Sequence, residues 1–143
     1  MQNDVLYNDI INEVTTLIEE SSADVVDYVV EEDTSDIWTY RKWASGVAEC
    51  WCKKQITITS WSVWGALYEG TPSMAPLNFP TDLFNAIPCT TATLSLDGVS
   101  GGTLFEMGRV SQSTIDYIIP VRPTEGGTPI TYNASIYAIG RWK

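Results

Sequence analysis

The sequence predicts a mainly β protein, an antiparallel β-sandwich head preceded by a short N-terminal α-helix. From residue 37 onward, about seven or eight short segments rich in β-branched and aromatic residues alternate with turn signals, at intervals of roughly 10–15 residues, a spacing typical of sandwiches and barrels. Five of the six tryptophans fall between Trp38 and Trp64. Since a tryptophan buries roughly 150–250 Å², this window is expected to hold the core.

Residues 3–22 are predicted to form the helix, with Asn3 or Asp4 as its N-cap. Apolar side chains recur along it at helical spacing, at Tyr7, Ile10, Ile11, Val14, Leu17 and Ile18. Such a helix can pack on its own domain, or it can end a coiled-coil stalk, where a stripe this wide favours more than two chains.

The charge distribution favours the stalk. Residues 1–36 contain eleven acidic and no basic residues, whereas residues 37–143 contain seven acidic and eight basic ones. A helix packed on a nearly neutral body would have less reason to carry its own acidic surface. We therefore expect residues 1–23 to be an acidic helix that ends a coiled-coil stalk of more than two chains, and residues 24–143 to be the head.

Residues 37–54 are predicted to be two aromatic-rich strands joined by a tight turn at Ala44-Ser45-Gly46. Trp38 and Tyr40 share one face of the first strand and Trp43 lies on the other, so both faces carry aromatic residues. A sheet with two such faces is covered on both sides. We expect one side to pack on the second sheet and the other on a neighbouring subunit.

The other elements of the head are predicted from the alternation of apolar and polar residues and from turn-forming residues. A strand or extended linker is expected at residues 23–32, and a short helical turn capped by Thr81 at residues 81–87. Further strands are expected at residues 55–68, 89–96, 103–107, 113–122 and 130–141. Loops or turns are expected at residues 31–36, 69–80, 97–102 and 123–129, the last joining the final two strands as a hairpin.

The three cysteines, Cys50, Cys52 and Cys89, are expected to be buried reduced thiols. An odd number excludes a full disulfide framework. Cys50 and Cys52 share a strand face at a spacing that suits a mutual disulfide poorly. The chain has no histidine, and structural zinc usually needs four Cys or His ligands, so no metal or cofactor is expected.

Catalytic motifs are absent from the sequence. Without histidine there is no Ser-His-Asp or Cys-His arrangement, and no glycine-rich phosphate motif occurs. A pair of carboxylates for glycoside cleavage stays open, because distances in space cannot be read from the chain. The expectation is a protein that is not an enzyme and has no catalytic residues.

Trp61, Trp64 and Tyr68 are the candidate binding residues, since they precede a proline-rich stretch and can line a rim. Aromatic rings stack on the apolar faces of sugars while neighbouring polar groups bond the hydroxyls. The alternative is that these three residues belong to the core or to a subunit interface. The abundance of aromatic residues in β-cores favours that alternative.

The charge and hydropathy of the chain argue against nucleic acid and membrane as its partners. A nearly neutral head lacks the basic face of a nucleic-acid binder. No apolar run is long enough for membrane insertion. The N-terminus lacks the basic and apolar regions of a secretory signal, so the protein is expected to be made in the cytoplasm of its cell.

Three stretches carry a resemblance to a known family. Residues 37–51 read IWTYRKWASGVAECW, residues 79–88 read FPTDLFNAIP, and residues 137–143 read YAIGRWK. Together they resemble the C-terminal receptor-binding head domains of tail fibre proteins from tailed phages and prophages of gut Firmicutes. The resemblance covers about residues 24–143. The chain departs from such fibres in being short, because a full fibre has a long shaft and a virion-attachment domain.

The resemblance implies a trimeric β-structured head on a shaft, located in the virion tail. Its partners would be two further copies of itself, other tail proteins, and a host cell-surface polysaccharide or protein. It implies no catalytic motif and transfers no binding residue by position. The function expected is non-enzymatic recognition of a host glycan by a phage or prophage tail. The alternatives are a structural virion or baseplate protein without a receptor, and a glycan-degrading tail enzyme.

Overall fold

The structure is a computed structural model that describes residue 12, residues 26–96 and residues 103–143. Apart from Asn12, which is helical, the predicted helix at residues 3–22 lies outside the described residues, and so does the predicted turn at residues 97–102. From residue 26 onward, the described residues form strands and the segments that connect them. No helix in the described part of the chain is long and apolar enough to cross a membrane.

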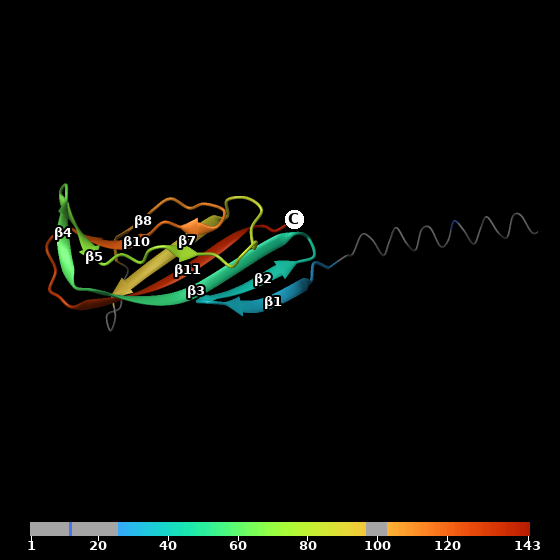
Figure 1. Cartoon of the computed structure of the whole chain (residues 1–143), viewed down its shortest axis with the longest axis horizontal. Coiled ribbons are helices and arrows are strands. Elements are labelled where there is room, and N and C mark those ends of the chain that lie inside the picture. The colour runs from blue at the N-terminus through green and yellow to red at the C-terminus, as the bar shows by residue number, and fades with distance from the viewer. Residues whose placement is uncertain (1–11, 13–25, 97–102) are drawn as a thin grey trace, which may run out of the picture.

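The long strands lie side by side along the length of an elongated head (Figure 1). The described strands are β1 (Val29–Ser35), β2 (Trp38–Trp43), β3 (Val47–Ile58), β4 (Ser60–Trp64), β5 (Leu67–Thr71), β6 (Leu77–Asn78), β7 (Cys89–Leu96), β8 (Phe105–Met107), β9 (Thr114–Ile115), β10 (Ile118–Arg122) and β11 (Ile130–Arg141).

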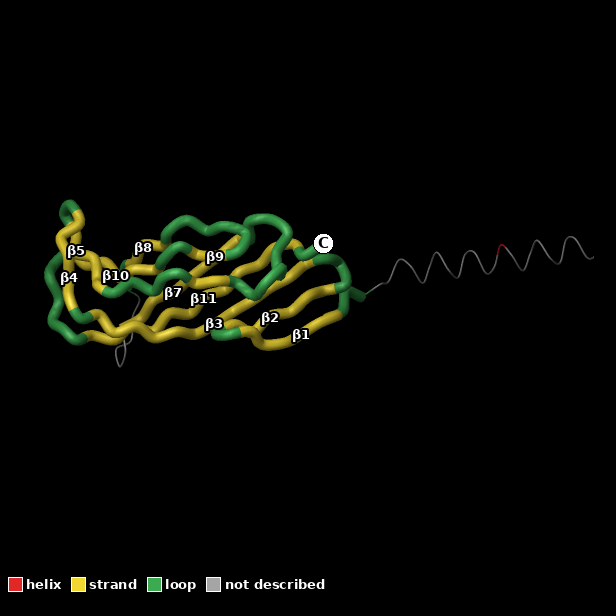
Figure 2. The backbone as a smooth tube through the Cα atoms, in the orientation of Figure 1, coloured by secondary structure: helices red, strands yellow, loops and turns green. Residues whose placement is uncertain are grey.

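The strands form two layers, which confirms the predicted antiparallel sandwich. One layer is a five-stranded sheet in the order β1-β2-β3-β11-β7. The other holds a four-stranded sheet, β4-β5-β10-β8, and a two-stranded ribbon, β6-β9. All of the registered pairs are antiparallel. Figure 2 shows the loops and short strands of the second layer lying over the long strands of the first.

The two longest strands, β3 and β11, form the centre of the first sheet. They pair over their full lengths, from Val47 opposite Arg141 to Ile58 opposite Ile130. Because side chains alternate along a strand, every second residue points into the sandwich. The buried members of these two rows are Ala48, Cys50, Cys52, Ile56, Ile58, Tyr132, Ala134, Ile136 and Ala138.

Trp38 joins this sheet to the opposite layer. Its side chain is 1% exposed, and its Nε1 donates a hydrogen bond of 2.6 Å to the carbonyl of Asn78. Its ring lies 5.3 Å from that of Phe79, which in turn lies 5.4 Å from that of Phe84. The predicted short helical turn at residues 81–87 is wrong, because the two phenylalanines anchor this segment as an irregular loop with a turn at Thr81 and Asp82.

The predicted tight turn between the two aromatic strands is confirmed, and it holds the chain segment that precedes β1. Gly46 has a φ of 90°, a conformation that favours glycine. Ser45 donates hydrogen bonds of 2.8 and 2.6 Å to the carboxylate of Asp27. Trp142 donates to the carbonyls of Gly46 and Trp43, each at 3.0 Å. The end of the chain and the start of the head are thus fixed at one pole, here called the proximal end.

The predicted polar turn at residues 31–36 is wrong, because β1 runs through it to Ser35. Glu31 bonds Lys42 and Tyr40 at 2.8 and 2.7 Å, and Glu32 pairs with Arg41. These carboxylates are exposed on a strand at the edge of the sheet. An edge strand tolerates charge well, and charge there discourages pairing with other chains.

Four further expectations about strands and loops need correction. Residues 55–68 are not one strand: β3 ends at Ile58, and β4 turns back into β5 at Gly65, whose φ is 61°. The expected loop at residues 69–80 contains the end of β5 and all of β6. Residues 113–122 divide into β9 and β10. The loop at residues 123–129 is not a hairpin, because β10 pairs with β5 and β8 while β11 pairs with β3 and β7.

The cysteines are free thiols, as expected, but they differ in exposure. Cys50 and Cys52 are buried and Cys89 is exposed, so the expectation of three buried thiols is wrong for Cys89. Burial raises the pKa of the Cys50 thiol to about 12 and that of Cys52 to about 11, which leaves both protonated and unreactive at neutral pH.

We therefore expect one fast-reacting thiol in the folded protein. A disulfide reagent at pH 7 should modify Cys89 within minutes, and Cys50 and Cys52 should react only after denaturation. The Cys89→Ser variant is the control and should show no fast phase. A second fast thiol in the folded protein would contradict the burial of the pair.

Candidate functional site

The outer face of the five-stranded sheet carries an apolar surface near the proximal end. Alternation points Ala48 and Cys50 inward, and their neighbours on β3 therefore point outward. The outward apolar side chains are half-buried or exposed and are here called the proximal patch: Trp43, Val47, Trp51, Tyr137 and Ile139. The two-sided aromatic pattern predicted for residues 37–54 is thus present, and none of the strands in residues 26–96 and 103–143 forms a layer over this face.

Glu49 lies within the proximal patch and orders the rings around it. Its carboxylate accepts hydrogen bonds from Tyr137 Oη at 2.6 Å and from Trp43 Nε1 at 3.3 Å. The bond to Glu49 raises the pKa of Tyr137 to about 12, so the hydroxyl stays protonated even at alkaline pH. The Arg41 guanidinium lies 5.1 Å from the centre of the Trp51 ring, a cation–π contact. The patch is therefore preorganised.

The opposite end of the head is formed by the hairpin of β4 and β5, here called the distal hairpin. Figure 1 shows it at the far end from β1 and from the C-terminus. At its tip, Val63 is 71% exposed and Trp64 is 47% exposed. Large apolar side chains with that exposure at a projecting tip are suited to contact with another molecule.

The structure brings two of the three predicted binding residues together and separates the third. Val63 pairs with Tyr68, and Trp64 pairs with Leu67. Trp61 lies two residues before Val63, so Trp61, Val63 and Tyr68 share one face, and Trp64 points to the opposite face. The predicted rim of three aromatic residues is therefore not a single surface.

The face of the distal hairpin that holds Trp61 and Tyr68 lies beside a basic residue that was not among the predicted site residues. Arg122 on β10 pairs with Tyr68, and its guanidinium lies 5.5 Å from the centre of the Trp61 ring. The loop at residues 123–129 closes over both, and a Cβ added at Gly126 would meet Arg122 and Trp61 atoms within 3 Å. Trp61 is thus half-buried between Arg122 and this loop, while Trp64 is exposed.

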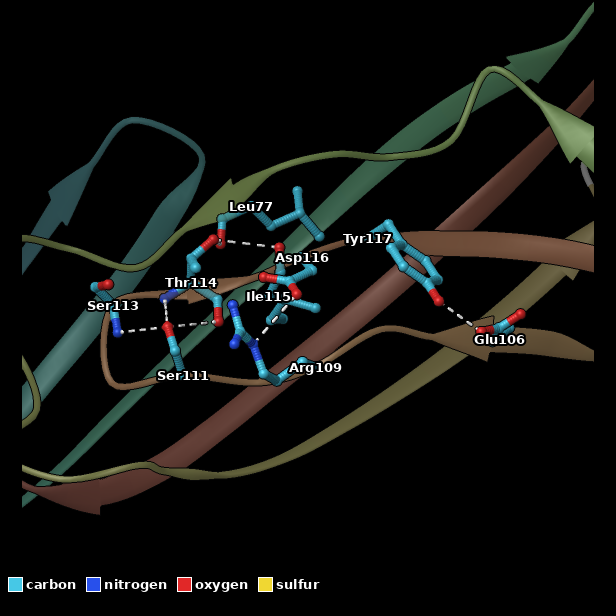
Figure 3. A network of polar contacts seen from close by, with 9 residues as sticks. All are labelled: Leu77, Glu106, Arg109, Ser111, Ser113, Thr114, Ile115, Asp116 and Tyr117. Atoms are coloured by element: carbon cyan, nitrogen blue, oxygen red, sulfur yellow. Dashed lines mark hydrogen bonds and ion pairs between the residues drawn. The ribbon is translucent and has the colours of Figure 1, made fainter.

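Two acidic side chains of the second layer, Glu106 and Asp116, have partners close by in the chain (Figure 3). Tyr117 donates a hydrogen bond of 2.6 Å to Glu106, and Arg109 pairs with Asp116 at 3.4 Å. The bond to Glu106 raises the pKa of Tyr117. The same segment is tied to β6, since Thr114 Oγ1 donates to the carbonyl of Leu77. These contacts hold the connection between β8 and β10 in place.

Metal-ligating residues do not gather in the described part of the chain. Among residues 26–96 and 103–143, no three Cys, Asp or Glu side chains lie close enough together to hold a metal ion.

These features define a class by fold: a two-layer antiparallel sandwich with the first residues of the head and the C-terminus at one pole and a projecting hairpin at the other. The chain is similar to an N-truncated R1-type pyocin tail fibre, with a TM-score of 0.53, 15% sequence identity, and coverage of 88% of this chain and 94% of that one.

A second solved structure is similar to this chain to the same degree. It comprises the C-terminal residues of the R1 pyocin fibre of P. aeruginosa, with a TM-score of 0.51 and 16% identity. The match covers 81% of this chain and 28% of that longer fragment. No protein-family model matches the chain, and no curated protein matches it significantly. The resemblance to tail fibre heads stated from the sequence is therefore confirmed at the level of fold.

Proposed function

We propose that this chain is the non-enzymatic receptor-binding head of a phage or prophage tail fibre. The observation that carries the proposal is the shared fold with the R1-type pyocin tail fibre, over 88% of this chain and 94% of that one. The three sequence stretches that resemble tail fibre heads support it independently. In this proposal the protein is a component of the virion tail, made in the host cytoplasm and assembled with other tail proteins.

The head would function as a homotrimer held together by the proximal patch. Trp51 is half-buried, and Tyr137 and Ile139 are 37% and 38% exposed. An apolar sheet face of this kind is stabilised when a second surface excludes water from it. The patch lies near the end where the chain enters the head, so three copies joined there would leave the distal hairpins pointing away from the shaft.

The distal hairpins would contact a host cell-surface glycan. Trp64 offers a ring face for stacking on a sugar, while Ser62 and Glu69 on the same face offer polar groups. Each such contact is weak by itself. Three sites that bind at once exceed the affinity of one by a factor of about 10²–10⁴, which explains why such a head would be trimeric.

Trp64→Ala should reduce binding to the recognised glycan at least about tenfold on an array of bacterial surface polysaccharides, because it removes the exposed stacking surface. Its matched control is Ile87→Ala, which truncates another exposed apolar residue, 68% exposed, on the loop that precedes β7. Ile87→Ala should bind as the wild type does. Equal binding by Trp64→Ala and wild type would remove Trp64 from the site.

We expect the protein to bind the glycan without cleaving it. Incubation of the protein with host wall material should release no reducing sugar above the level of a heat-denatured sample. Release that scales with protein concentration would assign a glycan-degrading activity instead.

A further inference from the structure

The segment that leads into β1 and forms its first residues is apolar and uncovered. It comprises residues 26–30 and is here called the neck. Four of its five side chains are large and apolar, and all four are exposed: Val26, Tyr28, Val29 and Val30. Val26 is 81% exposed and Tyr28 is 60% exposed. Large apolar side chains that are exposed next to one another mark a contact site.

Hydrogen bonds fix the neck to the head. The carbonyl of Tyr28 accepts a hydrogen bond of 2.9 Å from the amide of Ala44. One residue earlier, the Asp27 carboxylate accepts its two hydrogen bonds from Ser45. Tyr28 therefore continues the line of β1 beside the end of β2, and its exposed ring projects from a backbone that is held in place.

A hollow of about 280 Å³ lies in the proximal patch, on the outer face of the sheet. Its apolar walls are Trp43, Val47 and Ile139, and two acidic residues, Asp27 and Glu49, complete the lining. Each of these carboxylates accepts two hydrogen bonds, and a carboxylate offers about four acceptor positions. The hollow therefore suits a side chain with an apolar body and a hydrogen-bond donor at its end.

Tyrosine is such a side chain, because its ring packs on apolar walls while its hydroxyl donates. Tyr28 of the same chain is not one of the residues that line the hollow. It follows Asp27 directly, and consecutive side chains of an extended segment point to opposite sides. Since Asp27 faces the hollow, Tyr28 is directed away from it. A Tyr28 that fills the hollow therefore comes from another copy of the chain.

The proposed trimer brings the Tyr28 of a neighbouring copy to the level of the hollow. Its subunits would be related by rotation about an axis along the length of the head, because the long strands of the contacting sheet run in that direction (Figure 1). Such a rotation leaves the position of every residue along the axis unchanged. Asp27 lines the hollow and Tyr28 is the next residue, so each neck lies level with its neighbour's hollow. A contact of this kind between unlike surfaces closes a ring of three.

We propose that Tyr28 of each copy inserts into the hollow in the proximal patch of its neighbour. The inference rests on the proposed function, because it names the contact that holds the proposed trimer. The ring lies against Trp43 and Ile139, and the hydroxyl donates a hydrogen bond to Glu49. The exposed neck and the uncovered patch are thus the two halves of one contact, which is complete only in the assembly.

Disulfide trapping tests this contact. Tyr28→Cys and Ile139→Cys are combined in one chain that also carries Cys89→Ser, because Cys89 lies opposite Ile139. Within a chain, β2 and β3 separate the line of β1 from β11. Three steps of about 4.8 Å give about 14 Å, which is beyond the reach of about 7 Å between the Cα atoms of a disulfide. Mild oxidation should therefore link different chains and give covalent trimer on a non-reducing gel.

The matched control combines Tyr28→Cys with Val63→Cys in the same Cys89→Ser chain. Val63 is 71% exposed, but it lies on the distal hairpin, at the opposite end of the head from the neck. This variant should give no covalent trimer. Covalent trimer to the same extent in both variants would mean random collision and would overturn the proposal.

Sedimentation equilibrium gives a second measurement without new cysteines. Tyr28→Ala should raise the concentration at which the trimer half dissociates at least about tenfold, because the ring and the hydroxyl are both lost. Tyr28→Phe loses only the hydroxyl and should have a smaller effect. Leu104→Ala is the control: it truncates an apolar residue that is 65% exposed beside β8, and it should leave the trimer unchanged.

The remaining outcomes separate this contact from the proposed function. A trimeric wild type that yields no covalent trimer with the Tyr28 and Ile139 cysteines, or a Tyr28→Ala trimer as tight as wild type, would refute the insertion and leave the proposed trimer standing. A monomeric wild type would refute both. Binding to cells, which Trp64→Ala reports, is a separate readout: its failure would refute the receptor-binding role while a trapped trimer still supports the contact.

Discussion

Trp38→Ala is expected to destabilise the head by about 3–5 kcal/mol, the usual cost of replacing a buried tryptophan or phenylalanine with alanine. The residue is 1% exposed, so the substitution leaves a cavity between the two layers. It also removes the donor to the carbonyl of Asn78 and the ring packed on Phe79. Since small domains are stable by only about 5–15 kcal/mol, much of the protein's stability would be lost.

Chemical denaturation followed by tryptophan fluorescence measures this effect. Trp64→Ala makes the same chemical change at a side chain that is 47% exposed, and its cost should stay below about 1 kcal/mol. A loss in Trp38→Ala no larger than in Trp64→Ala would contradict the place of Trp38 in the core and the docking of residues 79–84 against it.

Trp51→Glu is expected to convert the proposed trimer into monomers. Each copy would bring one carboxylate into a contact from which water is excluded, and an unpaired buried charge costs several kcal/mol. In the monomer the new carboxylate would remain in water beside Arg41, which lies over Trp51 in the wild type. The fold of the single head should therefore survive.

Light scattering after size exclusion distinguishes the two states. Wild type should have three times the chain mass of 15.8 kDa, and Trp51→Glu should have that mass once. Val63→Glu is the matched control, because it introduces the same charge at a residue that is 71% exposed on the distal hairpin; it should remain trimeric. A monomeric wild type, or a trimeric Trp51→Glu, would remove the proximal patch from subunit contact.

The long central strands could be predicted from sequence because burial follows a strict period of two. The predicted ranges 89–96 and 130–141 coincide with β7 and β11, where small or apolar residues such as Ala134, Ile136 and Ala138 alternate with polar ones. The tight turn at Gly46 was also predictable, since it needs a positive φ. Regular alternation and glycine turns are the signals that a single sequence carries most clearly.

The wrong predictions of strands and turns have physical causes. The acidic run at residues 31–36 indicated a turn, but an edge strand accepts charges that an inner strand would not. The alternation of Ile56 and Ile58 passed without a break into an aromatic segment, so the turn at Gly65 was missed. The pairing of β10 with β5 rather than β11 depends on contacts between the layers, which local patterns do not encode.

The candidate sites were only partly predictable. Trp64 was singled out as an aromatic residue, but its separation from Trp61 and Tyr68 follows from the unpredicted register of the distal hairpin. Arg122 was missed because a lone arginine on a strand carries no signal.

The central claim, a head that attaches a tail to a cell-surface glycan, is tested most directly by binding of the fluorescently labelled protein to a panel of gut Firmicutes strains. We expect saturable binding to some strains, lost after periodate oxidation of surface glycans, retained after protease treatment of the cells, and reduced by Trp64→Ala. Binding to no strain, or binding that survives periodate but not protease, would contradict it.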